Sequence, residues 1–270
     1  MNKESNFIEF KNNGKIWAIG SVHSNLHSFE NVKKFILKKF DRKDNLVFLG
    51  NILGLGDYSK ETLSSVLDLR FKLMSKFTFK PNQIVFLRGA QEEMFSKILQ
   101  LQLAPNPIEI INWMFEHGVN KTLNSYGFSD NEVLNIASSG TVSISKWTSR
   151  LNHVLKQNYG HLEYFLNLKH AAYSESKKIL FVNRGVDITR PLSAQNDCFW
   201  WGFQNFSKIT KPYNSFVRIV RGYQSEKFNK IEESKNNVIC TLFKQPLSCN
   251  KIIVGIFQEN GEILDIFENI

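Results

Sequence analysis

The run Leu46-Val47-Phe48-Leu49-Gly50 is a short apolar segment that ends in glycine, and two similar runs flank it. The earlier one is Ile16-Trp17-Ala18-Ile19-Gly20, and the later one is Ile84-Val85-Phe86-Leu87-Arg88-Gly89. Between the three runs, residues 29–40 and 59–73 place apolar side chains at helical spacing. This alternation of strand and helix predicts a parallel sheet with right-handed crossovers.

The rest of the chain predicts a helical region and then a second group of strands. Residues 92–168 have a mostly helical pattern, which is broken at Ala104-Pro105-Asn106-Pro107. Strand-like runs follow at 179–182, 216–220, 238–243, 252–257 and 263–267. We therefore expect a single α/β domain over residues 1–270, with two sheets and a helical cap insertion at about 92–168.

Composition excludes several classes of protein. The 270 residues are 42% hydrophobic and 13% aromatic, which excludes a disordered chain, and no apolar run is long enough for an ordinary membrane span. The start of the chain lacks the apolar core of a secretory signal, and Cys198, Cys240 and Cys249 show no C-x-x-C spacing. We expect a reduced, cytoplasmic compartment and no membrane partner.

The net charge is weaker evidence about the protein's partner than the composition is about its class. Lys and Arg number 34 and Asp and Glu 25, so the formal net charge is 34 − 25 = +9. A basic cluster at Lys33, Lys34, Lys38, Lys39, Arg42 and Lys43 could meet nucleic acid, but it is expected to lie opposite an apolar helical stripe. A solvated helix face is the simpler interpretation, and a nucleic-acid partner is not expected.

The three glycine-ended runs lead into loops of small and polar residues: 20–25, 50–56 and 89–93. Ligands of an open parallel sheet bind at the carboxyl ends of the strands, so these loops should converge on one crevice. Further segments carry recognisable patterns: Trp113–Gly127, Phe181–Asp187 with Arg190-Pro191-Leu192 and Gln195, Arg218–Tyr223, and Asn260–Leu264.

In these motifs and in their order, the chain resembles the calcineurin-like metallophosphoesterases nearly end to end. It is most similar to the bacterial branch with PPP-type serine/threonine phosphatases and symmetrical diadenosine tetraphosphatases. That family reads G-D-x-H-G, G-D-x-x-D/A-R-G, G-N-H-E, H-A-G and G-H. The resemblance implies a four-layer αββα sandwich with a helical cap insertion.

The same resemblance implies a metal site whose positions are mostly emptied here. The first aspartate is Ser21, while the histidine of that motif is retained as His23. The bridging aspartate is Asn51, and the next acidic position and the phosphate-binding arginine are Gly54 and Leu55.

The remaining positions of the family's site have changed as well. They are Ala90 for the asparagine ligand, Gln91 for the proton-donating histidine, and Asn183 and Tyr223 for the two later histidines. Two divalent cations need carboxylates to offset their charge, and no matched position supplies one.

We therefore expect no catalytic residue, no metal ligand and no cofactor. The predicted function is that of a pseudo-phosphatase, a binding or regulatory protein whose partner is a phosphorylated protein, a nucleotide or another protein. Two alternatives stay open: an active phosphohydrolase with rebuilt ligands, and a nucleic-acid binder that uses the basic face. Weak binding of a single ion through His23 also stays open.

Other chemistry-bearing residues have simpler explanations. Asp57 and Asp187 could replace lost ligands but are typical turn residues. Glu92 and Glu93 suit the start of a helix, where the helix dipole favours acidic side chains. Cys198 and the pair Trp200-Trp201 indicate a packed cluster, although the tryptophans could stack a base.

Overall fold

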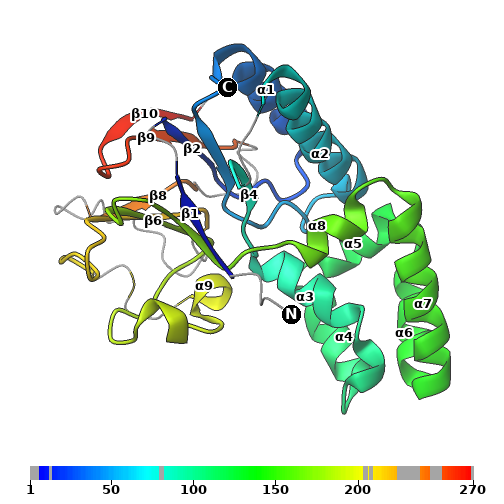
Figure 1. Cartoon of the computed structure of the whole chain (residues 1–270). Coiled ribbons are helices and arrows are strands. Elements are labelled where there is room, and N and C mark those ends of the chain that lie inside the picture. Colours follow the sequence, from blue (N-terminus) through cyan, green and yellow to red (C-terminus); the bar gives the residue numbers. More distant parts are fainter. Residues whose placement is uncertain are drawn as a thin grey trace.

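The structure is a computed structural model that describes residues 6–11, 14–78, 82–202, 206, 209–223, 238–243 and 251–268. Cys249 lies outside the described residues. The strands form two sheets of five, which pack face to face (Figure 1).

Sheet B contains the three runs that end in glycine. Its strands β2, β3 and β4 run parallel, and the hairpin β9–β10 continues the sheet antiparallel beyond β2. The order is β10 (Ile263–Phe267), β9 (Val254–Phe257), β2 (Ile16–Ile19), β3 (Asn45–Phe48) and β4 (Ile84–Phe86). The predicted parallel strands and closing hairpin are confirmed.

Sheet A contains two strands that the sequence did not predict. The order is β1 (Phe7–Phe10), β5 (Ala171–Ser174), β6 (Ile179–Val182), β7 (Arg218–Arg221) and β8 (Ile239–Thr241). The unpredicted strands are β1 and β5, which pair in parallel with each other. Their sequences, FIEF and AAYS, contain polar or small residues and lack the continuous run of large apolar side chains that marked the predicted strands.

Two layers of apolar side chains hold the sandwich together. Between the sheets, the rings of Phe181 on β6 and Phe257 on β9 meet at 5.7 Å. The outer face of sheet B is covered by α1 (Leu26–Lys39) and α2 (Ser59–Lys76), with buried residues such as Phe29 and Leu69.

The outer face of sheet A has a thinner cover. Phe199 of the short helix α9 (Cys198–Trp201) and Phe216 are buried in one cluster against Leu180 and Ile219. A 3-10 turn, η2 (Leu192–Ala194), precedes α9. The predicted sandwich is thus present, with its longer helices on sheet B.

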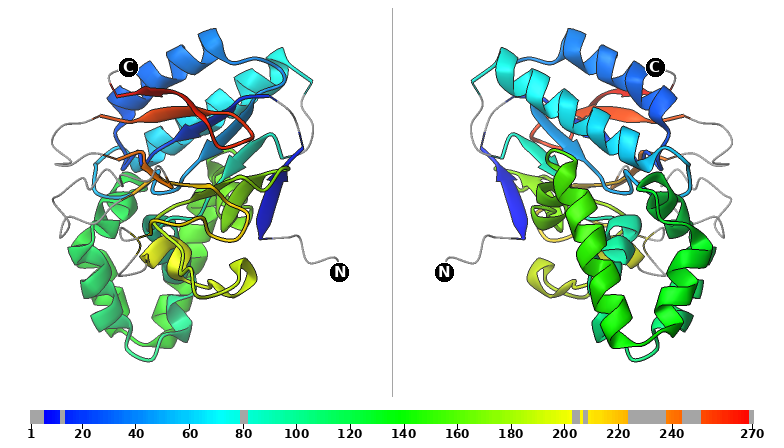
Figure 2. Two further views of the ribbon diagram at one scale, coloured as in Figure 1. Left: turned by 90° about the vertical axis from the view of Figure 1, so that its left-hand side faces the viewer. Right: turned by 90° about the vertical axis from the view of Figure 1, so that its right-hand side faces the viewer.

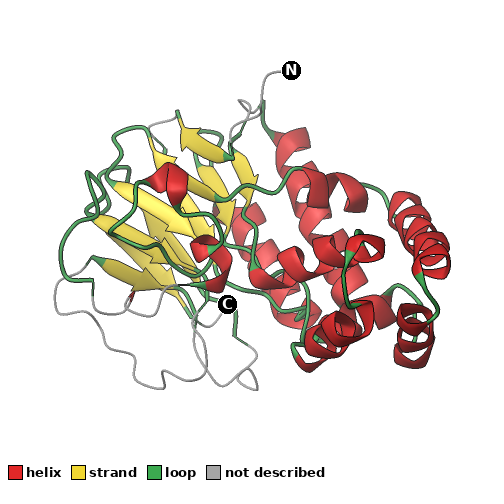
Figure 3. Ribbon diagram, turned by 90° about the horizontal axis from the view of Figure 1, so that it is seen from below, coloured by secondary structure: helices red, strands yellow, loops and turns green. Residues whose placement is uncertain are grey.

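The predicted helical insertion consists of successive short helices on one side of the sandwich (Figures 2 and 3). They are α3 (Ala90–Ile98), η1 (Leu101–Leu103), α4 (Pro107–Glu116), α5 (Val119–Ser125), α6 (Asp130–Ser138), α7 (Thr141–Gln157) and α8 (His161–Leu166). The expected break is present, because η1 ends at Leu103 and Pro107 begins α4. Within the described ranges, no helix is both long and apolar enough to cross a membrane.

One residue of the predicted basic face is buried instead. Lys33 is only 8% exposed and forms an ion pair with Asp68 of α2 at 2.8 Å and a hydrogen bond with Ser65. The pattern placed this lysine opposite the apolar stripe, but α2 covers that side of α1 and supplies the counter-charge. Lys34, by contrast, is exposed.

Candidate functional site

The loops after five strands meet at one edge of the sandwich, as expected from the parallel strand order. The backbone of the β2 loop contacts the other loops, since Ser21 N donates to Gly222 O at 3.0 Å and His23 N to Asn51 O at 2.8 Å. Gly222 N in turn donates to Asn183 O at 2.9 Å. The structure thus brings together the segments that carry the predicted site residues.

Asn51 links two other site positions through its side chain. Its Oδ1 accepts from the backbone N–H of Gln91 at 3.1 Å, and its Nδ2 reaches Ser21 Oγ at 3.4 Å. All three residues are at most 7% exposed. The amide is therefore oriented by the protein itself. Ala90, next to Gln91 at the first position of α3, offers no polar side-chain atom.

Gln91 occupies the space beside the glycine of the β3 loop. Its Nε2 donates to the carbonyl of His117 at 2.8 Å, which holds the side chain against Gly54. A Cβ added at Gly54 would overlap the Oε1 and Cδ atoms of Gln91. The absence of a side chain at position 54 thus permits the position of Gln91.

Asn183 is fully buried at the end of β6. Its Nδ2 donates to the carbonyl of Leu49 at 2.6 Å, so its amide ties sheet A to sheet B. Gly50 lies beside this amide and has a positive φ of 82°. A side chain at Gly50 would collide with the backbone of Gly89.

His23 lies in an aromatic cage. Its ring meets Tyr223 edge-on at 5.3 Å and Phe243 at 6.0 Å, while Arg184 lies over the Tyr223 ring at 5.6 Å. Burial lowers the pKa of His23 to about 4, although the Leu53 carbonyl nearby favours the protonated ring. His23 is therefore neutral at pH 7.

Four buried polar atoms of the site have no partner within the described part of the chain. Both ring nitrogens of His23 fall short of hydrogen-bond geometry, including toward Leu53, and so do Gln91 Oε1 and Asn183 Oδ1. One nitrogen of the neutral ring carries a hydrogen and the other accepts, so the set has one donor and three acceptors. Unpaired buried polar atoms are costly, and this set suits water or a mainly donating group better than an anion.

Glu92 has a role that the sequence did not reveal. Its carboxylate is fully buried and accepts from the backbone N–H of Asn51 at 2.7 Å, Ile52 at 2.8 Å and Leu53 at 3.3 Å. It also accepts from Gly89 N at 3.1 Å. Burial raises the pKa of Glu92, and these N–H groups oppose the rise.

The phenol of Tyr164 completes this arrangement. Its hydroxyl donates to Glu92 Oε1 at 3.2 Å, and both residues are buried. Glu92 therefore connects the β3 loop, the start of α3 and α8. The helix dipole explains why an acidic residue stands at the start of α3, but it does not explain why the Glu92 carboxylate binds the β3 loop.

Four residues of the site loops have left-handed backbone conformations. They are His23, Ser24, Asn51 and Leu55, with φ between 49° and 63°. Such conformations cost energy for residues other than glycine and persist where the surroundings fix them. The site loops thus keep a tight backbone geometry, although most of the metal-binding side chains of the family that the chain resembles are replaced.

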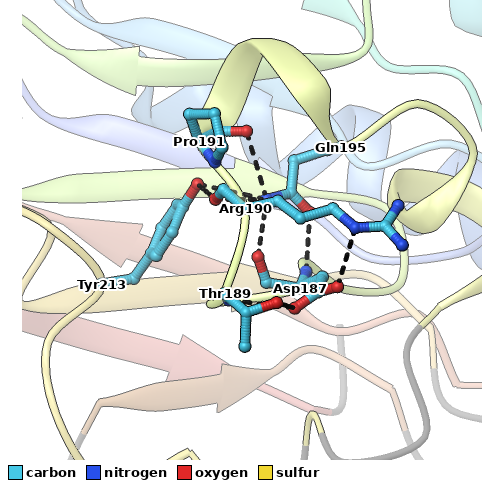
Figure 4. A network of polar contacts seen from close by, with 6 residues as sticks. All are labelled: Asp187, Thr189, Arg190, Pro191, Gln195 and Tyr213. Carbon is cyan, nitrogen blue, oxygen red and sulfur yellow. Dashed lines mark hydrogen bonds and ion pairs between the residues drawn. The ribbon is translucent and has the colours of Figure 1, made fainter.

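Neither alternative aspartate belongs to the site. Asp57 is exposed and pairs with Lys121 at 2.8 Å. Asp187 accepts from Thr189 Oγ1 at 2.6 Å and pairs with Arg190 at 3.1 Å, and the Thr189 hydrogen bonds lower its pKa (Figure 4). Both contacts agree with the interpretation as turn residues.

Gln195 organises the same turn from inside. Its Oε1 accepts from Asp187 N at 2.6 Å, and its Nε2 donates to Asp187 O at 2.7 Å and Arg190 O at 3.0 Å (Figure 4). Tyr213 closes the network by donating to Arg190 O at 2.6 Å. The motif around Gln195 therefore has a structural role.

The other candidates also have structural contacts. Glu93 pairs with Arg88 at 2.6 Å, and Cys198 is a buried free thiol. Trp200 is buried in the cluster that covers sheet A, whereas Trp201 meets Trp113 at 5.8 Å. The packed interpretation of these residues agrees with the structure.

No protein-family model and no curated protein matches the sequence. Solved structures do match. A putative diadenosine tetraphosphatase is 13% identical, covers 99% of both chains and has a TM-score of 0.54. A serine/threonine phosphatase from Saccharomyces cerevisiae with similarity to human phosphatase PP5 is 16% identical, over 99% of this chain and 85% of that one, with a TM-score of 0.53.

The chain has the metallophosphoesterase fold. A cold-active protein-tyrosine phosphatase of a psychrophilic Shewanella species is also similar, at 11% identity, 97% of this chain, 83% of that chain and a TM-score of 0.51. At these identities the likeness establishes the fold.

The residues present do not fit the dinuclear centre that the metallophosphoesterase fold implies. The matched positions bring neutral amides, a hydroxyl, a phenol and one imidazole, and no carboxylate. Among the residues that the structure describes, no group of three or more His, Cys, Asp and Glu is placed to hold a metal ion. Two divalent cations would find no carboxylate at the matched positions to offset their charge.

Proposed function

We propose that the chain is a catalytically degenerate metallophosphoesterase, a pseudo-phosphatase that binds or regulates a partner without hydrolysing it. The observation that carries this proposal is the contact between Gln91 and Gly54. The side chain of Gln91, which stands where the family has its proton-donating histidine, fills the space that an acidic side chain at position 54 would need. A neutral side chain held by His117 O thus replaces the proton donor and closes the next acidic position of the motif.

The electrostatics of the site support the same proposal. Carboxylates left behind after partial loss of a metal site would be buried without counter-charges, which is costly. Instead, Ser21, Asn51 and Asn183 make neutral hydrogen bonds within the protein. Neutral hydrogen bonds of this kind need no cation to balance them.

The partner is expected to be a phosphorylated protein, a nucleotide or another protein. The unpartnered atoms of the site are the oxygens Gln91 Oε1 and Asn183 Oδ1 and the two ring nitrogens of the neutral His23, of which one carries a hydrogen and the other accepts. These atoms offer a phosphate group one donor against three acceptors and no positive charge. We therefore favour a protein partner that contacts the loops around the site.

We also propose a cytoplasmic location. Cys198 and Cys240 are buried free thiols, and burial raises the pKa of Cys240 to about 11. Buried, protonated thiols react slowly and are typical of structural cysteines in a reducing compartment.

Metal content and turnover test the loss of hydrolysis. Protein purified from cells supplied with Mn²⁺ is analysed by mass spectrometry of its metals and assayed with an aryl phosphate and with diadenosine tetraphosphate. We expect substoichiometric metal and no turnover above that of the His23→Ala variant.

The proposal would be overturned if the protein held stoichiometric metal and showed turnover that His23→Ala or Asn51→Ala abolished. That result would identify an active phosphohydrolase with rebuilt ligands. Weak binding of one ion without turnover would support it, because a single His23-bound ion is compatible with a degenerate site.

A further inference from the structure

A separate cleft of about 750 Å³ lies between the free edges of the two sheets and the helices. It is lined by β1, β4, the middle of α2, and the segment from the end of α7 through α8. None of the site positions that match the metallophosphoesterase motifs lines it. Its volume suits a ligand of a few tens of atoms.

The cleft has an apolar floor and an aromatic rim. Leu67 and Phe86 lie buried at the floor. At the rim, Phe71 of α2 is 39% exposed and Tyr159 is 79% exposed, and their rings meet at 5.3 Å with an angle of 36° between planes. A largely exposed aromatic pair beside a cleft is a surface on which a planar ring can stack.

A cation accompanies each ring of this pair. Arg70 precedes Phe71 on α2, and Lys156 lies in the last turn of α7, three residues before Tyr159 in the turn that follows. Lys11 joins them from the end of β1, and no described carboxylate forms an ion pair with any of these three cations.

The net charge of the cleft is positive. Four cations (Lys11, Arg70, Lys156 and Lys169) and two carboxylates (Glu9 and Glu163) line it, which gives 4 − 2 = +2. Positive charge on the walls of a concave, partly apolar site concentrates anions there.

We propose that this cleft binds a nucleotide. The base stacks on the Tyr159–Phe71 pair, Arg70 and Lys156 contact the phosphates, and Glu9 and Glu163 offer acceptors for ribose hydroxyls. The size of the cleft favours one or two nucleotide units over a long strand. This proposal does not depend on the loss of catalysis, since none of the positions matched to the metallophosphoesterase motifs lines the cleft.

Calorimetric titration at low salt tests the proposal with three probes: ADP, pyrophosphate and a single-stranded 12-mer oligonucleotide. We expect ADP to bind and Arg70→Gln to weaken both ADP and pyrophosphate about tenfold, the equivalent of one charge-assisted contact. Tyr159→Ala is expected to weaken ADP about tenfold and leave pyrophosphate unchanged, because stacking involves only the base.

Lys146→Gln is the matched control. Lys146 is an exposed lysine of α7, the helix that carries Lys156, but it does not line the cleft. We expect parental affinity for both small probes. Tyr159 is largely exposed, so its replacement by alanine leaves the core intact.

Three results would overturn the proposal: no ADP binding, ADP binding that neither cleft variant weakens, or a 12-mer that binds far more tightly than ADP through the same residues. The last result would identify the cleft as part of a nucleic-acid surface instead.

Discussion

The carboxylate of Glu92 and the backbone N–H of Asn51 form a 2.7 Å hydrogen bond between residues 41 positions apart in the sequence. The same carboxylate accepts from Ile52, Leu53 and Gly89 and from the Tyr164 hydroxyl. One buried side chain thus fixes the loop in which Asn51 has a left-handed conformation.

Replacing Glu92 by glutamine should destabilise the protein strongly. Whichever way the new amide points, its NH₂ group faces at least two N–H or O–H donors that lose their acceptor. We expect the free energy of unfolding to fall by about 3 kcal/mol. Urea denaturation followed by circular dichroism measures this change.

Tyr164→Phe is the graded comparison, since it removes one donor and leaves the backbone contacts. A loss of about 1 kcal/mol is expected. Equal losses for the two variants would contradict a central role for the Glu92 carboxylate.

Stability should fall as the pH drops from about 6.5 toward 5. Burial lowers the pKa of both His23 and His161 to about 4, whereas the unfolded chain binds protons near the ordinary value. The unfolded state therefore binds more protons in this range, and each histidine adds a slope of up to about 1.4 kcal/mol per pH unit.

The variant His23→Asn separates this contribution, because asparagine tolerates the left-handed conformation at position 23 and does not titrate. Its stability, measured by denaturation between pH 5 and 7, should depend less steeply on pH than that of the parent. An unchanged slope would show that the His23 ring takes up its proton in the folded state.

Gly54→Ala should be destabilising for two separable reasons. The positive φ of 80° costs about 1 kcal/mol for any residue with a Cβ. The collision with Gln91 adds about 2 kcal/mol, which the Gln91→Ala background should remove.

Gly127→Ala is the control for the conformational cost. Gly127 has a φ of 89°, and an added Cβ would meet no atom within 4 Å. Its cost should be the same with or without Gln91→Ala, as measured by thermal denaturation. Absence of coupling between positions 54 and 91 would refute the steric account.

Gln195→Ala should loosen the turn after β6. The variant leaves the Asp187 N–H without its acceptor and removes one of the two donors to each of the carbonyls of Asp187 and Arg190. We expect a loss of about 2 kcal/mol, against about 1 kcal/mol for Tyr213→Phe. Hydrogen exchange at the Asp187 amide should accelerate in Gln195→Ala, and unchanged protection would count against this role.

Much of the fold was predictable from local patterns. The runs before Gly20, Gly50 and Gly89 combine apolar content with a residue that ends a strand, so their pairing followed from general rules of topology. β1 and β5 carry no such signal, because their partners are defined only once the two sheets are assembled.

The site was predictable as a set of positions but not as a set of contacts. The resemblance made Asn51, Gln91 and Asn183 site positions, and the structure has them at one edge of the sandwich. Glu92 binds the backbone of Asn51, which lies 41 positions earlier, and Lys33 pairs with Asp68 on another helix. Residue type and helical periodicity do not encode such contacts.

The packing of Gln91 against Gly54 also bears on how the proposed loss of catalysis could be reversed. An acidic side chain introduced at position 54 would meet both an unfavourable backbone conformation and an occupied space. It would therefore need a change of Gln91 as well, and that change alone removes the hydrogen bond to His117 O. Under the proposed function the present state is entrenched, because an acidic residue at position 54 costs stability unless a second residue changes with it.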